Sequence, residues 1–219
     1  MAETVKEHDF IELDYTGKLE DGTVFDTTLE SLAKENHLHD EKMKYEPLVI
    51  CVGEKQLLPG LDDALQGAEI GKEHEIILTP ESAFGKREVK NIRVVPLGTF
   101  KEHNVQPQPG LQIDIDGQRG VVTRVSGGRV IVNFNHPLAG RKVVYTVKIN
   151  KKITDQKDQV LYFLSNTFRL PEEKIKVEVK EGKAVVELPM QLPEQITIAI
   201  GERLQEVTSL KEVKFAKKE

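Results

Sequence analysis

Alternating apolar and polar residues begin near the N-terminus and predict a β-hairpin. From Ile11 the apolar side chains alternate through Leu13 and Tyr15, and an acidic turn at Asp21-Gly22 precedes the next apolar pair. A period of two residues places these side chains on one face of a strand, and an Asp-Gly pair is a frequent turn between two strands.

The next segment alternates between charged stretches and short apolar runs. Residues 29–47 mix helix formers with charge and end at Pro47, which predicts a short surface helix or flap. After it the pattern predicts a strand at 48–53, an amphipathic helix at 57–66, a strand at 73–78 and a turn-rich loop at 79–87.

Residues 86–140 are richer in β-branched residues and are interrupted by prolines and glycines, which predicts a small β module. The expected strands are 111–115, 120–125 and 129–134, with 94–100 leading in. A further strand is expected at 143–149, followed by a charged linker or helix start and a domain boundary near residue 153.

The remaining residues have an apolar periodicity of their own. The expected order is a helix at 159–168, strands at 174–179 and 184–189, a helix at 195–207 and a strand at 210–216. The β-branched residues at 196–200 weaken the second helix, because such side chains favour strands. Taken together, the elements predict an α+β fold.

Composition and targeting signals favour a chain in the cytoplasm. Of its 219 residues, 38% are hydrophobic, and the longest apolar runs are far shorter than the ~18 residues of a membrane span. The single cysteine, Cys51, cannot form a disulfide within the chain, and Met1 is followed by a polar, acidic stretch instead of a signal peptide. We therefore expect a cytoplasmic protein without a membrane partner.

Charge is distributed unevenly along the chain. The net charge is −5, but residues 1–85 carry 7 basic against 20 acidic side chains, whereas 86–140 carry 8 against 4 and 141–219 carry 16 against 12. The acidic first part would repel phosphates, and the basic parts lack the aromatic pattern of common RNA-binding domains. We therefore expect separate modules and no nucleic-acid partner.

No motif indicates a metal, a nucleotide or an acyl-transfer site. His37 and His39 lie in a charged surface segment, where two histidines are usually solvated. His136 precedes a proline in a turn and is expected to be a hydrogen-bonded structural residue, and Cys51 a buried, inert thiol. The sequence predicts neither a metal nor a cofactor.

Four segments resemble the FKBP-type peptidyl-prolyl cis/trans isomerases, in particular the SlyD-like and long archaeal branch with a domain inserted in the flap. They are DYTGKLEDGTVFDTT (14–28), VGEKQLLPGLDDAL (52–65), TPESAFG (79–85) and NHPLAGRKVVYTVKI (135–149). Their order and spacing extend the resemblance over residues 8–150, and residues 154–219 are similar to the extra C-terminal domain of long archaeal members.

The resemblance implies a set of site residues. The implied catalytic residues are Tyr15, Asp26, Phe84 and Tyr145, and the implied substrate-binding residues are Phe25, Leu48, Leu57, Leu58 and Leu61. Taken singly, most of these would be expected in a core and Asp26 in a turn cap. Leu61 stands where drug-binding eukaryotic members have Trp, and Leu48 where Phe is common.

The resemblance also implies three domains. An isomerase domain would comprise residues 1–86 and 141–153, an inserted chaperone domain residues 87–140, and a C-terminal α+β domain residues 154–219. The expected activity is isomerisation of X-Pro bonds in unfolded or partly folded proteins. The inserted domain would hold such clients through an apolar surface of Val94, Val95, Leu97 and Phe100.

Two alternatives stay open at this point. The chain could be a chaperone or binding protein with little or no isomerase activity. The helix at 159–168 carries a broad apolar face that needs a partner, so residues 154–219 are expected to form a homodimer, with a second client-binding surface on a monomer as the competing interpretation.

Overall fold

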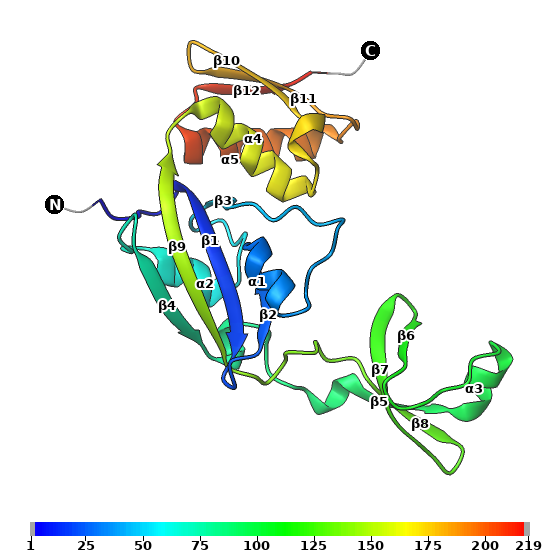
Figure 1. The fold of residues 1–219 in the computed structure, drawn as a ribbon. Helices are drawn as coiled ribbons and strands as arrows, with labels where there is room; N and C mark the ends of the chain where they lie inside the picture. Colours follow the sequence, from blue (N-terminus) through cyan, green and yellow to red (C-terminus); the bar gives the residue numbers. More distant parts are fainter. Residues whose placement is uncertain (1–2, 217–219) are drawn as a thin grey trace. The chain divides into compact units, whose positions relative to one another are not determined.

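The computed structural model describes residues 3–216, and contacts within the chain group it into two compact units (Figure 1). We call Thr79–Lys142 the inserted unit, and the rest of the chain, Met1–Leu78 with Val143–Glu219, the main unit. Helices and largely antiparallel sheets occur in both units, so the α+β class predicted from the sequence is confirmed.

The main unit contains a five-stranded antiparallel sheet that is completed only after the insertion. The sheet has the order β2-β1-β9-β4, and β3 also pairs with β1. Its strands are β1 (Phe10–Leu19), β2 (Val24–Thr27), β3 (Leu48–Cys51), β4 (Glu73–Leu78) and β9 (Val143–Ile153). Strands β1 and β2 form the predicted hairpin, and β9 continues four residues beyond its predicted end at residue 149.

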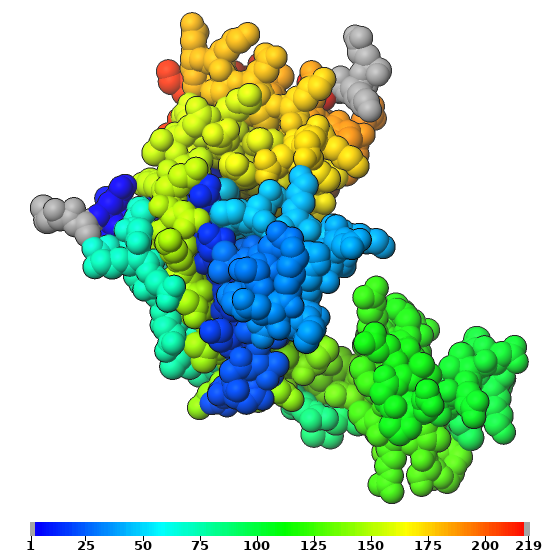
Figure 2. Space-filling view, viewed as in Figure 1, coloured from blue at the N-terminus to red at the C-terminus, as the bar shows by residue number. Residues whose placement is uncertain are grey.

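Two short helices accompany this sheet. They are α1 (Glu30–Glu35) and α2 (Pro59–Leu65). Pro59 opens α2 at a position where its missing N–H costs no hydrogen bond, and Leu61 and Leu65 bury the apolar face. Residues 29–47 lie at the surface of the main unit, as expected (Figure 2).

The last part of the main unit is a three-stranded sheet with two helices. Its elements are α4 (Gln156–Phe168), η3 (Glu172–Lys174), β10 (Lys176–Lys180), β11 (Lys183–Glu187), α5 (Glu194–Thr208) and β12 (Glu212–Phe215). Strands β10 and β11 pair antiparallel, and β11 and β12 pair parallel. The β-branched stretch at 196–200 is helical, because α5 buries Leu204 and Val207 and this packing outweighs the local strand preference.

The apolar face of α4 is covered within the chain. Val160, Phe163 and Leu164 are buried in one hydrophobic core that also contains Phe10 of β1 and Val49 of β3. The expectation that this helix face lacks a partner is therefore wrong, because the first sheet and the C-terminal elements share a core. Burial of α4 does not depend on a second copy of the chain.

The inserted unit is a small four-stranded antiparallel sheet of order β5-β8-β7-β6. Its elements are η1 (Pro80–Ser82), η2 (Val89–Asn91), β5 (Ile92–Pro96), α3 (Leu97–Glu102), β6 (Gln112–Ile115), β7 (Gln118–Ser126) and β8 (Arg129–Asn133). The predicted lead-in at 94–100 divides at Pro96, which caps α3. The three predicted strands are confirmed.

One residue of the predicted chaperone surface is buried. Phe100 is only 5% exposed and packs with Val122, Val130 and Val132 in the core of the inserted unit. A sheet of four short strands has few large side chains to fill its core, and the aromatic ring on α3 supplies one. Phe100 is therefore not available to a client in this structure, which corrects the expectation from the sequence.

The two units differ from the three predicted domains. Residues 79–86 and 141–142 group with the insertion, and residues 154–219 group with the first sheet. The division into three domains stays a prediction about how parts of the chain fold separately. Among the described residues, no helix combines the length and apolar character required to cross a bilayer.

Candidate active site

Four of the predicted site residues come from three neighbouring strands of the main unit. Tyr15 lies on β1, Phe25 and Asp26 on β2, and Tyr145 on β9. The strand register brings them together, because Gly17 of β1 is paired with Asp26 on one side and with Tyr145 on the other. Residues that are 130 positions apart in the sequence, Tyr15 and Tyr145, thereby become neighbours.

These four side chains form a compact group, which we call the aromatic cage. The Tyr15 hydroxyl donates a hydrogen bond to Oδ2 of Asp26 at 3.0 Å. The Tyr15 and Tyr145 rings are 5.9 Å apart between centroids, and the Phe25 ring meets Tyr145 edge-on at 5.8 Å and 85°. Edge-to-face and tilted contacts at these distances are favourable arrangements for aromatic rings.

Both phenols of the cage are held in the protonated form. Burial is the largest cause that raises the pKa of Tyr15, followed by the negative charge of Asp26 and the hydrogen bond to it. Burial and the Asp26 charge also raise the pKa of Tyr145. Since both pKa values lie above the ordinary tyrosine value, the Tyr15 hydroxyl keeps its proton for donation at neutral pH.

Hydroxyl groups next to the cage lock β1 to β2. Thr16 and Thr27 are buried and share a hydrogen bond of 2.9 Å between their Oγ1 atoms. Thr28 Oγ1 donates to Oδ1 of Asp14 at 2.8 Å and accepts the backbone N–H of Tyr15 at 3.0 Å. These bonds hold the backbone on both sides of Tyr15, so the cage rests on a rigid hairpin.

Gly17 lies directly against the cage but was not among the predicted site residues. A Cβ atom at this position would lie 2.7 Å from Cζ of Phe25 and 3.0 Å from Cε1 of Tyr145. Only a residue without a side chain lets the two rings approach the strand this closely. A glycine inside an otherwise regular strand pattern was the signal that could have identified it.

The four predicted leucines lie on β3, on α2 and in the loop between them. Leu61 of α2 is fully buried, whereas Leu48, Leu57 and Leu58 are half-buried. Leu58 directly precedes α2 and caps it, so the helix start determines where this side chain lies. The partly exposed leucines remain accessible to a ligand, as a binding surface requires.

Phe84 belongs to the inserted unit. Its half-buried ring stacks on the imidazole of His136, with centroids 4.6 Å apart and planes 2° from parallel. Nδ1 of His136 also accepts the backbone N–H of Leu138 at 3.1 Å. The prediction of a hydrogen-bonded structural role for His136 is confirmed.

The remaining candidates have structural surroundings. His39 stacks on Tyr45 at 5.3 Å and lies 3.3 Å from Glu30. Cys51 is buried, and burial is the main cause that raises the pKa of its thiol, so it stays protonated as expected. Among residues 3–216, no three His, Cys, Asp or Glu side chains are grouped so that they could hold a metal ion.

Comparisons with known proteins place these features in a family. The family model of FKBP-type peptidyl-prolyl cis-trans isomerases matches residues 1–101, and the model of the FKBP26 IF domain matches residues 93–138.

Three relatives illustrate the similarity. A short-type peptidyl-prolyl cis-trans isomerase of Methanocaldococcus jannaschii is 33% identical over 68% of this chain and 94% of its own length. A probable FKBP-type 16 kDa isomerase of Pseudomonas fluorescens is 28% identical, covering 64% of this chain and 85% of its own. The isomerase SlyD of Haemophilus influenzae is 29% identical, over 60% and 71%. Because the family model matches this chain and a relative is 33% identical over 94% of its own length, this chain belongs to the FKBP-type peptidyl-prolyl cis-trans isomerase family.

Proposed function

We propose that this chain is a peptidyl-prolyl cis/trans isomerase that acts on X-Pro bonds of unfolded or partly folded proteins. The observation that carries the proposal is the aromatic cage, in which the Tyr145 ring contacts the rings of Tyr15 and Phe25 and the Tyr15 hydroxyl donates to the Asp26 carboxylate. Family membership and the names of the relatives support the same reaction class.

Isomerisation of an X-Pro bond needs no nucleophile, and the protein can accelerate it by binding the twisted transition state more tightly than the planar amide. Amide resonance gives peptide-bond rotation a barrier of ~18–20 kcal/mol, and the twisted transition state has lost that resonance together with much of the polarity of the carbonyl group. An apolar cage solvates the less polar, twisted amide better than water does, relative to the planar amide. Contacts with the proline ring that improve on twisting therefore lower the barrier.

Asp26 has the more specific role in this proposal. Its carboxylate accepts the Tyr15 hydroxyl, so it fixes the direction of the phenol and places a negative charge beside the substrate amide. Because the pKa of Tyr15 is raised, the phenol stays neutral and donates. The pair would then orient the substrate and stabilise the charge that redistributes as the C–N bond loses its double-bond character.

A refolding assay limited by proline isomerisation tests this proposal, because the uncatalysed phase takes tens of seconds. We expect Asp26→Ala to lower kcat/KM by ~10- to 100-fold, the range that corresponds to losing one charge-assisted hydrogen bond. Asp63→Ala removes an exposed carboxylate from α2 and should leave catalysis unchanged. Full activity of Asp26→Ala would contradict the assignment of the site.

We infer a second function, holding of unfolded clients, for the inserted unit. Its strand β5 lies at an edge of the sheet, where unpaired backbone groups can accept an extended peptide. Val94 on this strand is 60% exposed, and Val89 just before it is exposed as well. An apolar edge strand offers both backbone hydrogen bonds and side-chain contacts to an unfolded chain, and the match to the IF domain model supports this function.

Suppression of the aggregation of a denatured test protein measures the holding activity. Val94→Lys should weaken suppression severalfold and slow catalysis on an unfolded protein, while turnover of a proline tetrapeptide stays unchanged. Ile77→Lys is the matched control, because Ile77 is 66% exposed on β4 of the main unit. Equal loss of protein and tetrapeptide turnover in Val94→Lys would count against a separate holding surface.

A further inference from the structure

The loop between β3 and α2 has a backbone conformation that depends on side-chain support. It carries Leu57 and Leu58, and two of its residues have positive φ angles, +91° at Gly53 and +54° at Lys55. Left-handed backbone is unfavourable for a residue with a side chain such as lysine, so its surroundings must hold it in place.

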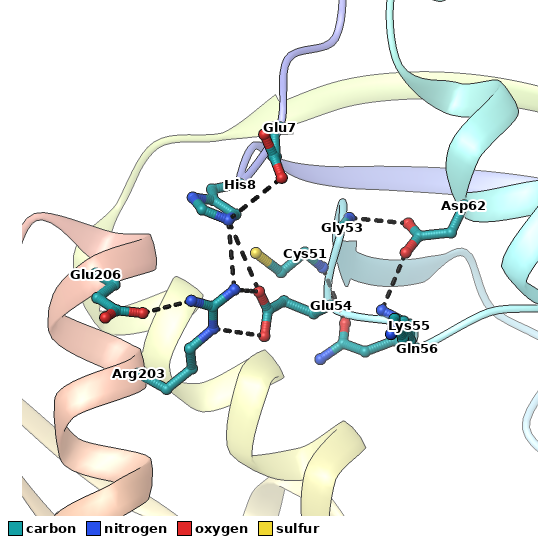
Figure 3. A network of polar contacts seen from close by, with 10 residues as sticks. All are labelled: Glu7, His8, Cys51, Gly53, Glu54, Lys55, Gln56, Asp62, Arg203 and Glu206. Atoms are coloured by element: carbon teal, nitrogen blue, oxygen red, sulfur yellow. Dashed lines mark hydrogen bonds and ion pairs between the residues drawn. The ribbon is translucent and has the colours of Figure 1, made fainter.

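One support comes from α2. Asp62 is buried, and its two carboxylate oxygens accept the backbone N–H groups of Gly53 and Lys55, each at 3.0 Å (Figure 3). These bonds tie the start of the loop to the helix that follows it. Glu54 lies between these two residues, and its side chain points away from α2 and towards Arg203 of α5 (Figure 3).

The second support comes from the C-terminal elements. The side chain of Glu54 is only 10% exposed, and Arg203 of α5 binds both of its carboxylate oxygens. Arg203 Nε donates to Oε2 at 3.0 Å, and Nη2 donates to Oε1. Arg203 also pairs with Glu206, and His8 lies 3.9 Å from Oε1 of Glu54. The charge of the nearly buried Glu54 carboxylate is thereby balanced by a bidentate contact with the Arg203 guanidinium group.

A third contact supports the same loop from α4. Asn166 Nδ2 donates to the backbone carbonyl of Val49 at 2.7 Å and to Oε1 of Gln56 at 3.4 Å. Gln56 in turn accepts the N–H of Cys51 at 2.9 Å. Helices α4 and α5 therefore both hold the short segment that leads to Leu57 and Leu58.

We propose that Arg203 is a positioning residue for the isomerase site, acting through Glu54 on the loop that carries Leu57 and Leu58. The inference rests on the proposed function, because Leu57 and Leu58 are substrate-binding residues only by the family resemblance. Without Arg203, the nearly buried Glu54 carboxylate loses its main partner, and the cost of leaving it unpaired favours loop conformations that expose it to water. The C-terminal elements are then part of the isomerase and shape its substrate surface.

A double-mutant cycle on the full chain separates positioning from general stabilisation. We expect Arg203→Ala to lower kcat/KM for a proline tetrapeptide by about tenfold, mainly through KM, which corresponds to ~1.4 kcal/mol. Arg203→Lys keeps the positive charge but loses the bidentate contact, so its kcat/KM should lie between those of the wild type and Arg203→Ala. Adding Glu54→Ala to Arg203→Ala should restore activity, because the carboxylate that drives the loop away is gone.

Lys183→Ala is the matched control, because it breaks an ion pair with Glu212 at 3.1 Å in the same C-terminal elements without touching the loop. It should leave kcat/KM unchanged. Hydrogen exchange supplies a readout that does not depend on activity: Arg203→Ala should speed exchange of the amides of Gly53 and Lys55, and the double variant should not.

The outcomes separate the two proposals. Wild-type activity in Arg203→Ala, or a double variant that loses the sum of both single effects, would overturn the positioning role while leaving the isomerase assignment in place. A wild-type chain without isomerase activity would overturn the proposed function. Faster exchange in the loop of Arg203→Ala would then still demonstrate the mechanical link between Arg203 and the loop.

Discussion

At the scale of single residues, the absence of a side chain at Gly17 decides how closely the cage can pack. Its φ angle is not among the positive ones, so alanine suits the backbone and the conflict is steric alone. Gly17→Ala should displace Phe25 and Tyr145, cost ~1–3 kcal/mol as overpacking does, and lower kcat/KM. Steady-state kinetics and urea denaturation would measure both effects.

Gly22 provides the opposite case for comparison. Its φ angle is +87°, and nothing lies within 4 Å of an added Cβ atom. Gly22→Ala should therefore strain the hairpin turn, lower stability and leave the cage intact. If the two alanine variants lost activity equally at equal stability, steric conflict in the cage would not be the cause.

At the scale of elements, α4 connects the two sheets of the main unit, and its start is capped. Asp155 accepts the backbone N–H groups of Lys157 and Asp158 at 2.9 and 3.1 Å. Asp155→Ala leaves these donors without a partner and should cost ~1 kcal/mol. For a chain of this size that is a fall in Tm of about 2–4 °C. Lys157→Ala, an exposed neighbour, should not lower Tm, and an equal fall there would argue against the cap.

At the scale of the whole molecule, we predict a homodimer formed through residues 154–219. The apolar face of α4 is covered within the chain. The prediction therefore rests on three exposed apolar side chains, Ile196 and Ile198 of α5 and Met190 in the segment that leads into α5. Light scattering at micromolar concentration should give the mass of two chains of 24.7 kDa. Ile198→Asp should shift this to one chain, whereas Val105→Asp in the inserted unit should not. A monomeric wild-type chain would instead favour a second client-binding surface.

Local sequence patterns were sufficient for most elements and for the family. Period-two alternation identified β1, and β-branched residues between turn signals identified β7 and β8. The four motif segments identified the cage residues. Strand propensity and turn chemistry depend on neighbouring residues, so a local pattern can show them. The partners of these elements were decided only in the tertiary structure. Periodicity shows that α4 has an apolar face, but it does not show that β1 and β3 cover it, or that Phe100 fills the core of the inserted unit.

The contacts that hold the β3–α2 loop were likewise outside the reach of the sequence. Asn166 meets Val49 across 117 residues, and Arg203 meets Glu54 across 149. Neither arginine nor glutamate carries a local signature of such a pairing, since both are ordinary surface residues in an amphipathic pattern. Local patterns along the chain were enough to assign most strands and helices and the family. Only the folded chain, by bringing distant segments together in one core, decided which charge is buried and what neutralises it.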